Sequence, residues 1–289
     1  WLWLLMKTCY GLKQASYEFW LKLLKSMKKM NYSRSNADPC LYYRWKENRL
    51  NVWVSWVDDL INFGPKKDVL QNKEEFKQEF ECDDVGWMEE YVGCKVHVDR
   101  ENKLMKITQP VLLQSFVDEF ELPDKSYDTP AEPRQVLDPA NEGDVLGPNE
   151  QDKYRSGVGK LLHMMRWSRP EIWNAVRELT KHNGKCNASH MKAMKRVMRY
   201  AVNTPNRGWR ISPEKRIRTG DNANIKFQIN GCPDASYAPC KVSRKSVTGY
   251  SVFLEGVVVA VKSGTQRIVA LSSAEAEVIA VIQCVQEML

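Results

Sequence analysis

The chain has 289 residues, which predicts two or three folded units at about 100 to 200 residues per domain. Hydrophobic residues make up 43% of the sequence and charged residues 27%, a composition that excludes a wholly disordered or fibrous protein. The 8 cysteines form no CxxC pair and there are only 4 histidines, so zinc-ribbon and zinc-knuckle spacings are absent. The net charge of +7 favours a polyanionic partner but does not identify one.

The two ends of the sequence suggest a fragment. The opening run from Trp1 to Met6 is apolar, but it is far shorter than the roughly 20 residues of a membrane helix and has no basic leader. We therefore expect no membrane or secretory role, and reduced cysteines inside the cell. The chain starts with Trp and ends in a helical pattern at Leu289, so we expect it to be incomplete at both ends.

Helical and strand patterns alternate in the first part of the chain. Residues 20–30 have apolar side chains at helical spacing with lysines opposite, and Pro110 opens a second amphipathic helix that ends near Phe120. An acidic, helix-like stretch covers 73–80. Strand-like runs lie at 40–45, 50–57, 60–64, 94–99 and 104–108. These runs predict three hairpins, and the second would have Asp58 and Asp59 at its tip.

A proline-rich segment separates this region from a second set of elements. Five prolines between Leu122 and Asp152 predict an extended linker. Helical patterns follow at 154–167, 170–182 and 189–202, then strand-like runs at 225–230, 248–255, 257–262 and 268–271, and a helix from about Ser273. Three antiparallel strands followed by a helix are typical of the start of a mixed α/β domain.

Positive charge is concentrated between Lys181 and Gly220, where Glu214 is the only acidic residue. A solvated helix face is one explanation, and contact with phosphates is the other. Because almost every charge in this segment is positive, contact with phosphates is the favoured explanation. The candidate binding residues on the third helix of this region are Lys192, Lys195, Arg196 and Arg199.

Two groups of carboxylates are candidates for metal binding. Asp58 and Asp59 are neighbours between two apolar strands; this is either ordinary turn chemistry or a pair whose mutual repulsion a divalent cation relieves. Asp234 follows a strand-like run, and Glu275 and Glu277 lie in the first turns of a helix. The glutamates could serve the helix dipole alone, or one could share a metal with Asp234.

The sequence resembles one known family, the reverse transcriptase and ribonuclease H region of copia-type long-terminal-repeat retrotransposon polyproteins. The matching blocks occur in the family's order over essentially the whole chain. They are Tyr10-Gly11-Leu12-Lys13-Gln14-Ala15, Asp38-Pro39-Cys40-Leu41-Tyr42, Val57-Asp58-Asp59-Leu60, Phe63-Gly64, Tyr91-Val92-Gly93, Tyr154-Arg155-Ser156, Val158-Gly159, Arg169-Pro170-Glu171-Ile172, His190 to Trp209, Asp234-Ala235, Arg244 to Tyr250 and Ala270 to Glu277.

The resemblance implies an α+β protein: a partial reverse-transcriptase palm and thumb, followed by a truncated ribonuclease H-like mixed α/β domain. On this basis we expect four regions. Residues 1–121 would form the palm and thumb, 122–153 a proline-rich linker, 154–222 a helical basic connection, and 223–289 the ribonuclease H-like domain. The expected partners are an RNA template, a DNA primer, RNA–DNA hybrid, deoxynucleotides and other parts of the polyprotein.

The resemblance also implies roles for individual residues. Asp58 and Asp59 would be two carboxylates of a polymerase site that uses Mg²⁺ or Mn²⁺ in two-metal nucleotidyl transfer. Asp234 and Glu277, with Glu275 as the second choice, would bind metal in a ribonuclease H site. The residues expected near the incoming nucleotide and template are Tyr10, Gly11, Lys13 and Gln14. Lys192, Lys195, Arg196 and Arg199 would track the backbone of the hybrid.

The sequence also departs from the family. Trp56 occupies a position where Tyr is usual, Ser16-Tyr17 replaces Pro-Arg, Ser236-Tyr237 replaces Asp-Trp, and Val278 replaces Tyr. The first palm Asp would lie upstream of Trp1 and further ribonuclease H carboxylates downstream of Leu289, so we expect both metal sites to be incomplete and this chain alone to be inactive. The alternative is a noncatalytic nucleic-acid-binding remnant of a decayed element. We expect an intracellular location: cytoplasmic, in retrotransposon particles, or nuclear.

Overall fold

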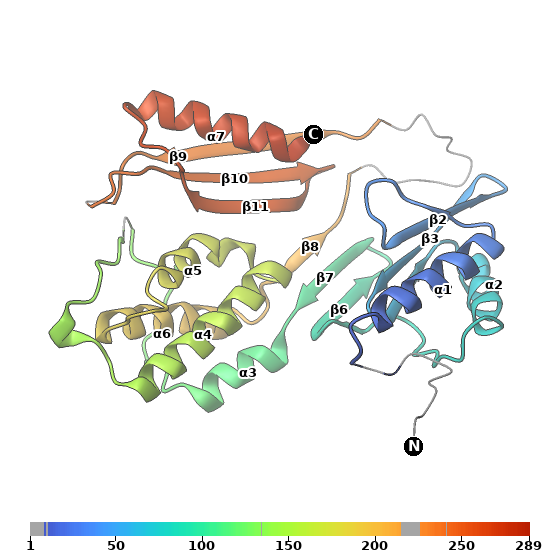
Figure 1. Cartoon of the computed structure of the whole chain (residues 1–289), viewed down its shortest axis with the longest axis horizontal. Helices are drawn as coiled ribbons and strands as arrows, with labels where there is room; N and C mark the ends of the chain where they lie inside the picture. The colour runs from blue at the N-terminus through green and yellow to red at the C-terminus, as the bar shows by residue number, and fades with distance from the viewer. Residues whose placement is uncertain (1–8, 10, 134, 215–225, 241) are drawn as a thin grey trace, which may run out of the picture. The chain divides into compact units, whose positions relative to one another are not determined.

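The computed structural model describes residues 9, 11–133, 135–214, 226–240 and 242–289. These residues form two compact units, one built from residues up to Met88 together with Lys226, and the other from the remainder, beginning at Glu89. Each unit has its own sheets and helices (Figure 1). In the described part of the chain, no helix is both long enough and apolar enough to span a membrane.

The first unit is a four-stranded antiparallel sheet with two helices on one face (Figure 1). The strands lie in chain order, β1 (Ser33–Arg34), β2 (Leu41–Lys46), β3 (Arg49–Trp56) and β4 (Asp59–Phe63), and the helices are α1 (Ala15–Lys29) and α2 (Lys66–Lys77). Leu23 and Met27 of α1 pack with Tyr42 and Trp53 of the sheet and Phe76 of α2. The hairpins are those that the alternating pattern predicts. Helix α2 begins at Lys66, earlier than the predicted 73.

The second unit contains a smaller antiparallel sheet and a group of helices. The sheet has the order β5 (Glu90–Tyr91), β6 (Cys94–Asp99), β7 (Leu104–Thr108) and β8 (Trp209–Ile211). The helices are α3 (Pro110–Glu119), α4 (Pro148–Trp167), α5 (Trp173–Thr180) and α6 (Ala188–Asn203), with short 3-10 turns η1 (Glu142–Asp144) and η2 (Pro170–Ile172). The sequence did not predict β8, which is only three residues long and pairs with β7 about a hundred residues earlier.

The core of this unit lies among the helices. Fully buried Tyr154, Leu161, Met194 and Met198 are members of the cluster between α4 and α6. The proline-rich segment before α4 is irregular apart from η1, as its composition predicts. It is nevertheless packed, since Leu122, Tyr127, Ala131, Leu137 and Leu146 contact this core. The segment is therefore an integral layer of the second unit.

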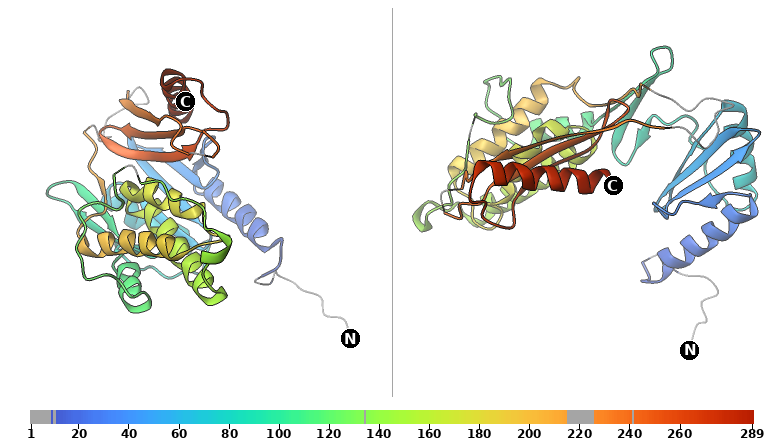
Figure 2. Two further views of the ribbon diagram at one scale, coloured as in Figure 1. Left: turned by 90° about the vertical axis from the view of Figure 1, so that its left-hand side faces the viewer. Right: turned by 90° about the horizontal axis from the view of Figure 1, so that it is seen from above.

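The C-terminal part of the second unit is a three-stranded antiparallel sheet followed by a helix (Figures 1 and 2). The sequence predicts this order, but the first strand covers 229–236 and not 225–230, so that Asp234 lies within the strand and not after it. The strands are β9 (Ile229–Ser236), β10 (Val247–Leu254) and β11 (Val257–Thr265), with β10 central, and α7 (Ser273–Met288) lies over one face. A Cβ atom on Gly231 would lie 2.6 Å from Sγ of Cys284, so glycine is needed where α7 approaches β9. The predicted strand at 268–271 is wrong, because those residues form no strand.

Candidate active site

Asp58 and Asp59 lie at the tip of the β3–β4 hairpin. Trp56 pairs with Asp59, which leaves Val57 and Asp58 as a two-residue turn. Both carboxylates are exposed, as the predicted hairpin requires. Two consecutive acidic residues are therefore open to solvent at one end of the sheet, where a cation or a cationic ligand would be attracted.

The backbone of this turn is strained at Val57. Its φ of 53° lies in the left-handed region, which a β-branched residue rarely adopts. Two-residue hairpin turns use this region because it matches the twist of the strands, and they normally place Gly, Asn or Asp there. Such strain costs on the order of 1–3 kcal/mol and persists only where the surrounding structure enforces it.

A buried polar network lies at the other end of this hairpin, away from the turn. Asn51 of β3 and Asn72 of α2 are 0% and 1% exposed, and the Asn72 amide donates to Oδ1 of Asn51 (3.0 Å) and of Asn62 on β4 (3.2 Å). The Asn51 amide in turn donates to Asp68 at 3.4 Å. Asparagines from three elements thus join α2 to both strands of the hairpin.

Charged groups complete this network. Arg49 donates to both carboxylate oxygens of buried Asp68, at 2.8 and 3.1 Å, and these hydrogen bonds hold the pKa of Asp68 below its usual range. Arg44 donates to Asn72 at 2.6 Å and to Glu75 at 3.0 Å. Gly64 fits beside the network because a Cβ there would lie 2.7 Å from Oδ1 of Asn51. This accounts physically for glycine in the Phe63-Gly64 block.

The residues predicted to lie near the incoming nucleotide and template come just before α1 in the chain. Gly11, Lys13 and Gln14 are exposed, and Gly11 has a φ of 89°, which favours glycine. Gln14 is the N-cap residue of α1. Tyr10 lies outside the described residues. Gly11, Lys13 and Gln14 therefore belong to an exposed, glycine-containing turn that leads into α1.

Two of the four basic residues predicted on α6 contact the proline-rich segment, and a third lies near Glu121, just before it. Arg196 forms an ion pair with Glu132, donates to Thr129 at 3.2 Å and lies 4.4 Å from the centre of the Tyr127 ring. Arg199 donates to the Asp124 carbonyl at 3.4 Å, and Lys195 is 3.9 Å from Glu121. Lys192 is exposed. Of the wider basic run, Lys215, Arg216 and Arg218 lie outside the described residues.

The second predicted carboxylate group is divided between β9 and the start of α7. Asp234 is exposed on β9, opposite Gly249 of β10. In the described sheet β9 is an edge strand. Glu275 accepts the Leu271 N–H at 2.6 Å while its own N–H donates to Ser272 at 3.1 Å. Glu275 is thus occupied in capping α7, and Glu277 is exposed.

The donor chemistry of the first pair suits a hard cation. Magnesium is commonly bound through one or two carboxylates, with water and substrate phosphates completing its coordination. Asp58 and Asp59 can supply two such oxygens. Among the described residues no three His, Cys, Asp or Glu side chains come together as a metal cluster, so the pair would form only part of a coordination sphere.

Sequence reasoning did not identify the polar network or the contacts of the proline-rich segment. Asn51 was a usable signal, because an amide interrupts an otherwise apolar strand pattern and a buried amide needs partners. The acidic residues Glu121 and Glu132 were a weaker signal, since they precede the basic helix but lie far from it in the sequence. Which cation each would meet depends on the fold and could not be inferred from spacing.

Comparison with known proteins adds family evidence to this geometry. Residues 1–133 match the family described as Reverse transcriptase (RNA-dependent DNA polymerase). This range includes the hairpin with Asp58 and Asp59, the polar network and α1 to α3. No solved structure gives a significant match to the chain.

Several proteins are similar over longer ranges. The chain is 28% identical over 301 aligned residues to the retrovirus-related Pol polyprotein from transposon TNT 1-94 of Nicotiana tabacum, covering 99% of the chain but 21% of that polyprotein. It is 24% identical to the putative transposon Ty5-1 protein YCL074W of Saccharomyces cerevisiae, over 99% of the chain and 89% of that protein. Over 46% of the chain it is 34% identical to the secreted RxLR effector protein 161 of Plasmopara viticola, 87% of which is covered.

The alignment to the transposon proteins extends over both compact units, whereas the family match is confined to residues 1–133. The chain spans about a fifth of the length of the tobacco polyprotein. With the hairpin motif and the order of the sequence blocks, these matches identify the region. The chain belongs to the reverse transcriptase region of retrotransposon Pol polyproteins.

Proposed function

We propose that the chain is part of an RNA-directed DNA polymerase with ribonuclease H activity, in which Asp58 and Asp59 hold Mg²⁺ or Mn²⁺ for nucleotidyl transfer. The observation that carries this proposal is the exposure of both carboxylates at a two-residue hairpin turn, in the segment that matches the reverse transcriptase family. A bound metal would supply charge neutralisation and activation of the primer 3′-hydroxyl.

Residues of the chain itself would hold the strands that carry the carboxylates and would contact the substrates. The antiparallel pairing of β3 with β4 positions the turn, and the network of Asn51, Asn72 and Asp68 fixes the other end of the same two strands against α2, so that the strands carrying the carboxylates are ordered before ligands bind. Gly11, Lys13 and Gln14 would contact the template and the incoming deoxynucleotide. Substrates would be an RNA template and a DNA primer, with other parts of the polyprotein as partners, in the cytoplasm, in retrotransposon particles or in the nucleus.

The ribonuclease H activity would involve Asp234 and Glu277 as metal ligands. Glu277 is preferred over Glu275 because the carboxylate of Glu275 accepts the backbone N–H of Leu271. The antiparallel sheet followed by α7 supports this assignment. Direct support would come from cleavage of an RNA–DNA hybrid by a longer polyprotein, lost on Asp234→Asn.

The second candidate function is noncatalytic binding of nucleic acid by the basic residues of α6. It is weaker, because Arg196 and Arg199 already contact the proline-rich segment and Lys195 lies near Glu121. A phosphate-binding site would show log affinity for hybrid that falls linearly with log salt. The substitution Lys192→Ala should reduce that slope by about one if this exposed lysine contacts a phosphate.

The test of the polymerase proposal combines metal binding with primer extension. Mn²⁺ should selectively broaden amide NMR signals of residues 56–60, and Asp58→Asn should abolish the effect, whereas Asp38→Asn, an exposed Asp on another loop, should not. We expect this chain alone to give no primer extension on an RNA template, and incorporation that depends on Asp58 would contradict that expectation while supporting the polymerase assignment. Absence of any Asp58-dependent effect of Mn²⁺ would contradict the proposed site.

A further inference from the structure

The edge of the first unit's sheet is open beside the second half of β2. Strand β1 pairs only with Tyr42 and Tyr43, so no described strand lies beside Trp45. The N–H of Ser35 donates to the carbonyl of Leu41 at 2.8 Å, which shows that alternate residues of β2 direct their backbone groups toward this edge. By the same alternation, the N–H and C=O of Trp45 point out of the sheet.

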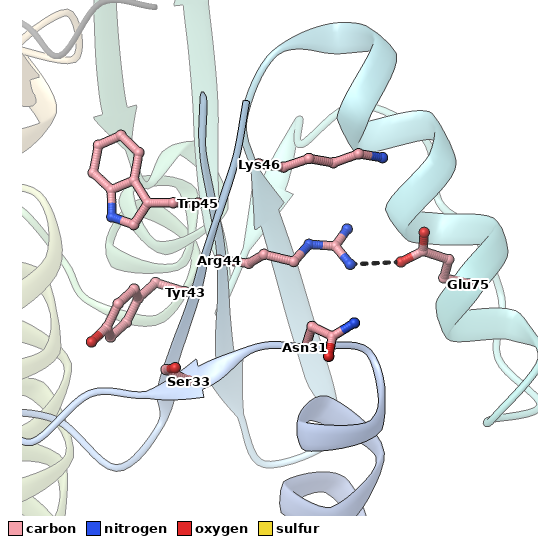
Figure 3. Close-up of a pocket in the computed structure, with 7 residues that line it drawn as sticks. All are labelled: Asn31, Ser33, Tyr43, Arg44, Trp45, Lys46 and Glu75. Carbon is pink, nitrogen blue, oxygen red and sulfur yellow. Dashed lines mark hydrogen bonds and ion pairs between the residues drawn. The ribbon is translucent and has the colours of Figure 1, made fainter. Parts of the chain in front are cut away.

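A notch of about 600 Å³ surrounds this open edge. Figure 3 shows that strand β2 divides the residues that line the notch into two groups. The rings of Tyr43 and Trp45 project from one face of β2, and the side chains of Arg44 and Lys46 project from the other face, toward α2. The full lining is Asn31, Ser33, Tyr43, Arg44, Trp45, Lys46 and Glu75.

The two sides differ in chemistry. Tyr43 and Trp45 are 37% and 41% exposed, so an aromatic shelf lies on one face of the open edge. On the other face Arg44 is paired with Glu75 at 3.0 Å. Lys46 donates to Gln71 at 2.9 Å and forms no ion pair within the described residues.

We propose that this notch binds an extended acidic peptide segment as an added β-strand. The backbone of the segment would exchange two hydrogen bonds with Trp45, and its side chains would alternate across the edge. The residue opposite Trp45 would be apolar and pack on the aromatic shelf, whereas the residues on either side of it would be acidic and face Arg44 and Lys46. The preferred sequence is therefore acidic, apolar, acidic.

A second copy of the chain fits this edge poorly. Antiparallel pairing of two β2 strands about a twofold axis at Trp45 would set Arg44 of each copy opposite Lys46 of the other. Like charges directly opposite each other destabilise a strand pair, and such charges commonly protect edges from self-association. An acidic partner removes this repulsion, which is why we assign the site to a different polypeptide segment.

The proposed surface is separate from the hairpin with Asp58. Trp45 pairs with Leu50 at the start of β3, whereas the turn follows Trp56 at its other end. Six residues of strand place the two about 20 Å apart. Peptide binding at the notch and metal binding at the turn can therefore be measured independently.

Calorimetric titration of the whole chain with short peptides tests the proposal. The probe is an acetylated, amidated Thr-Thr-Glu-Val-Glu-Thr-Thr peptide; the controls are the same peptide with N-methylvaline, which lacks the central N–H, and one with Lys-Val-Lys at the centre. We expect the first to bind and both controls to bind at least about tenfold more weakly. No binding of the first peptide, or equal binding of the N-methylated one, would overturn the proposal.

Chain variants locate the binding. Trp45→Thr keeps a β-forming residue but removes the shelf, and should weaken binding at least about tenfold; Trp56→Thr, which removes another exposed tryptophan of the same sheet, should not. Lys46→Glu should reverse the preference, so that the Lys-Val-Lys peptide binds better. This reversal would show that the protein remains folded. Unchanged peptide selectivity in Lys46→Glu, or a Trp45-dependent dimer in sedimentation, would overturn the assignment.

Discussion

The guanidinium of Arg196 on α6 binds the carboxylate of Glu132 in the proline-rich segment, 64 residues earlier in the chain. The same guanidinium lies over the ring of Tyr127. A side chain that the sequence predicts as a nucleic-acid contact therefore joins two parts of its own fold. The arrangement explains why a segment with so many prolines remains packed on a helix.

Arg196→Ala should destabilise the second unit. It removes the ion pair, the cation–π contact and the packing of a side chain that is only 14% exposed, which together should cost about 1–2 kcal/mol. Hydrogen exchange in peptides from 121–133 should rise. Lys192→Ala is the matched control, because that lysine is exposed on the same helix. Equal exchange in the two variants would mean that the segment is held by its apolar contacts alone.

The polar network behind the hairpin predicts a coupling between Gly64 and Asn51. Gly64→Ala should destabilise the first unit by about 1–3 kcal/mol, because the new Cβ would lie 2.7 Å from Oδ1 of Asn51. Asn51→Ala should cost a similar amount by leaving the Asn72 amide short of an acceptor. In the double variant the Gly64→Ala penalty should fall by about 1 kcal/mol or more.

The coupling is measured by hydrogen exchange of β3 and β4 in four proteins: the unmodified chain, Gly64→Ala, Asn51→Ala and the double variant. Gly159→Ala provides the control, because a Cβ at that exposed position of α4 meets no atom within 4 Å. This replacement should be neutral or stabilising by about 0.5–1 kcal/mol. Strict additivity of Gly64→Ala and Asn51→Ala would show that the close approach does not cause the penalty.

Local patterns were sufficient for much of the fold. The hairpins at β2–β3, β3–β4 and β6–β7 connect neighbouring strands through short turns, so alternation and turn residues in one stretch define them. Helix α3 was predicted within a residue because Pro110 opens it. The hairpin position of Asp58 and Asp59 followed from the same reasoning.

Other features depend on distant partners and escaped prediction. Strand β8 exists because it pairs with β7, and the apolar run 268–271 forms no strand, although its composition favours one. The capping role of Glu275 could be suspected from Ser272 three residues earlier. The partners of Arg196 could not, since they lie in a segment whose path has no periodic pattern.

Two stacked histidines make the second unit sensitive to acid. The rings of His182 and His190 lie 3.8 Å apart and are 6% and 0% exposed. Nδ1 of His190 accepts the Asn187 N–H at 3.2 Å, which leaves Nε2 to donate to the Asp138 carbonyl at 2.8 Å. His190 thus links the start of α6 to the proline-rich segment.

Burial, followed by the neighbouring His190, lowers the pKa of His182. The unfolded chain, with a histidine pKa of about 6.5, therefore binds a proton at a higher pH than the folded chain. The contribution of His182 to the free energy of unfolding of the second unit should be fully present above about pH 6.5. It should decrease as the pH falls below that value, by at most about 1.4 kcal/mol per pH unit. Denaturation between pH 5 and 8 measures this slope.

His182→Gln should flatten the dependence of stability on pH, even if it lowers stability at every pH. His163→Gln, which removes an exposed histidine of α4, should leave the slope close to that of the unmodified chain. A slope that persists unchanged in His182→Gln would assign the acid sensitivity to other groups.

Cys240 should be a reactive thiol near neutral pH. Its Sγ accepts the backbone N–H of Ser243 at 3.4 Å, and hydrogen bonds from Ser243 lower the pKa of the Cys240 thiol to about 7. Buried Cys94 is the opposite case, since burial raises its pKa to about 11. Because the thiolate is the nucleophile, iodoacetamide should label Cys240 with half-maximal rate near pH 7, whereas Cys94 should remain unlabelled in the folded chain.

Peptide mapping by mass spectrometry after brief labelling at pH 6, 7 and 8 distinguishes these thiols. Ser243→Ala removes the side-chain hydrogen bond but keeps the backbone one, so it should move the Cys240 profile to higher pH without changing the fold. Cys240→Ser should eliminate the rapid phase of labelling. A Cys240 profile centred near the ordinary thiol pKa of about 8.5 would mean that the hydrogen bonds of Ser243 do not stabilise the thiolate in solution.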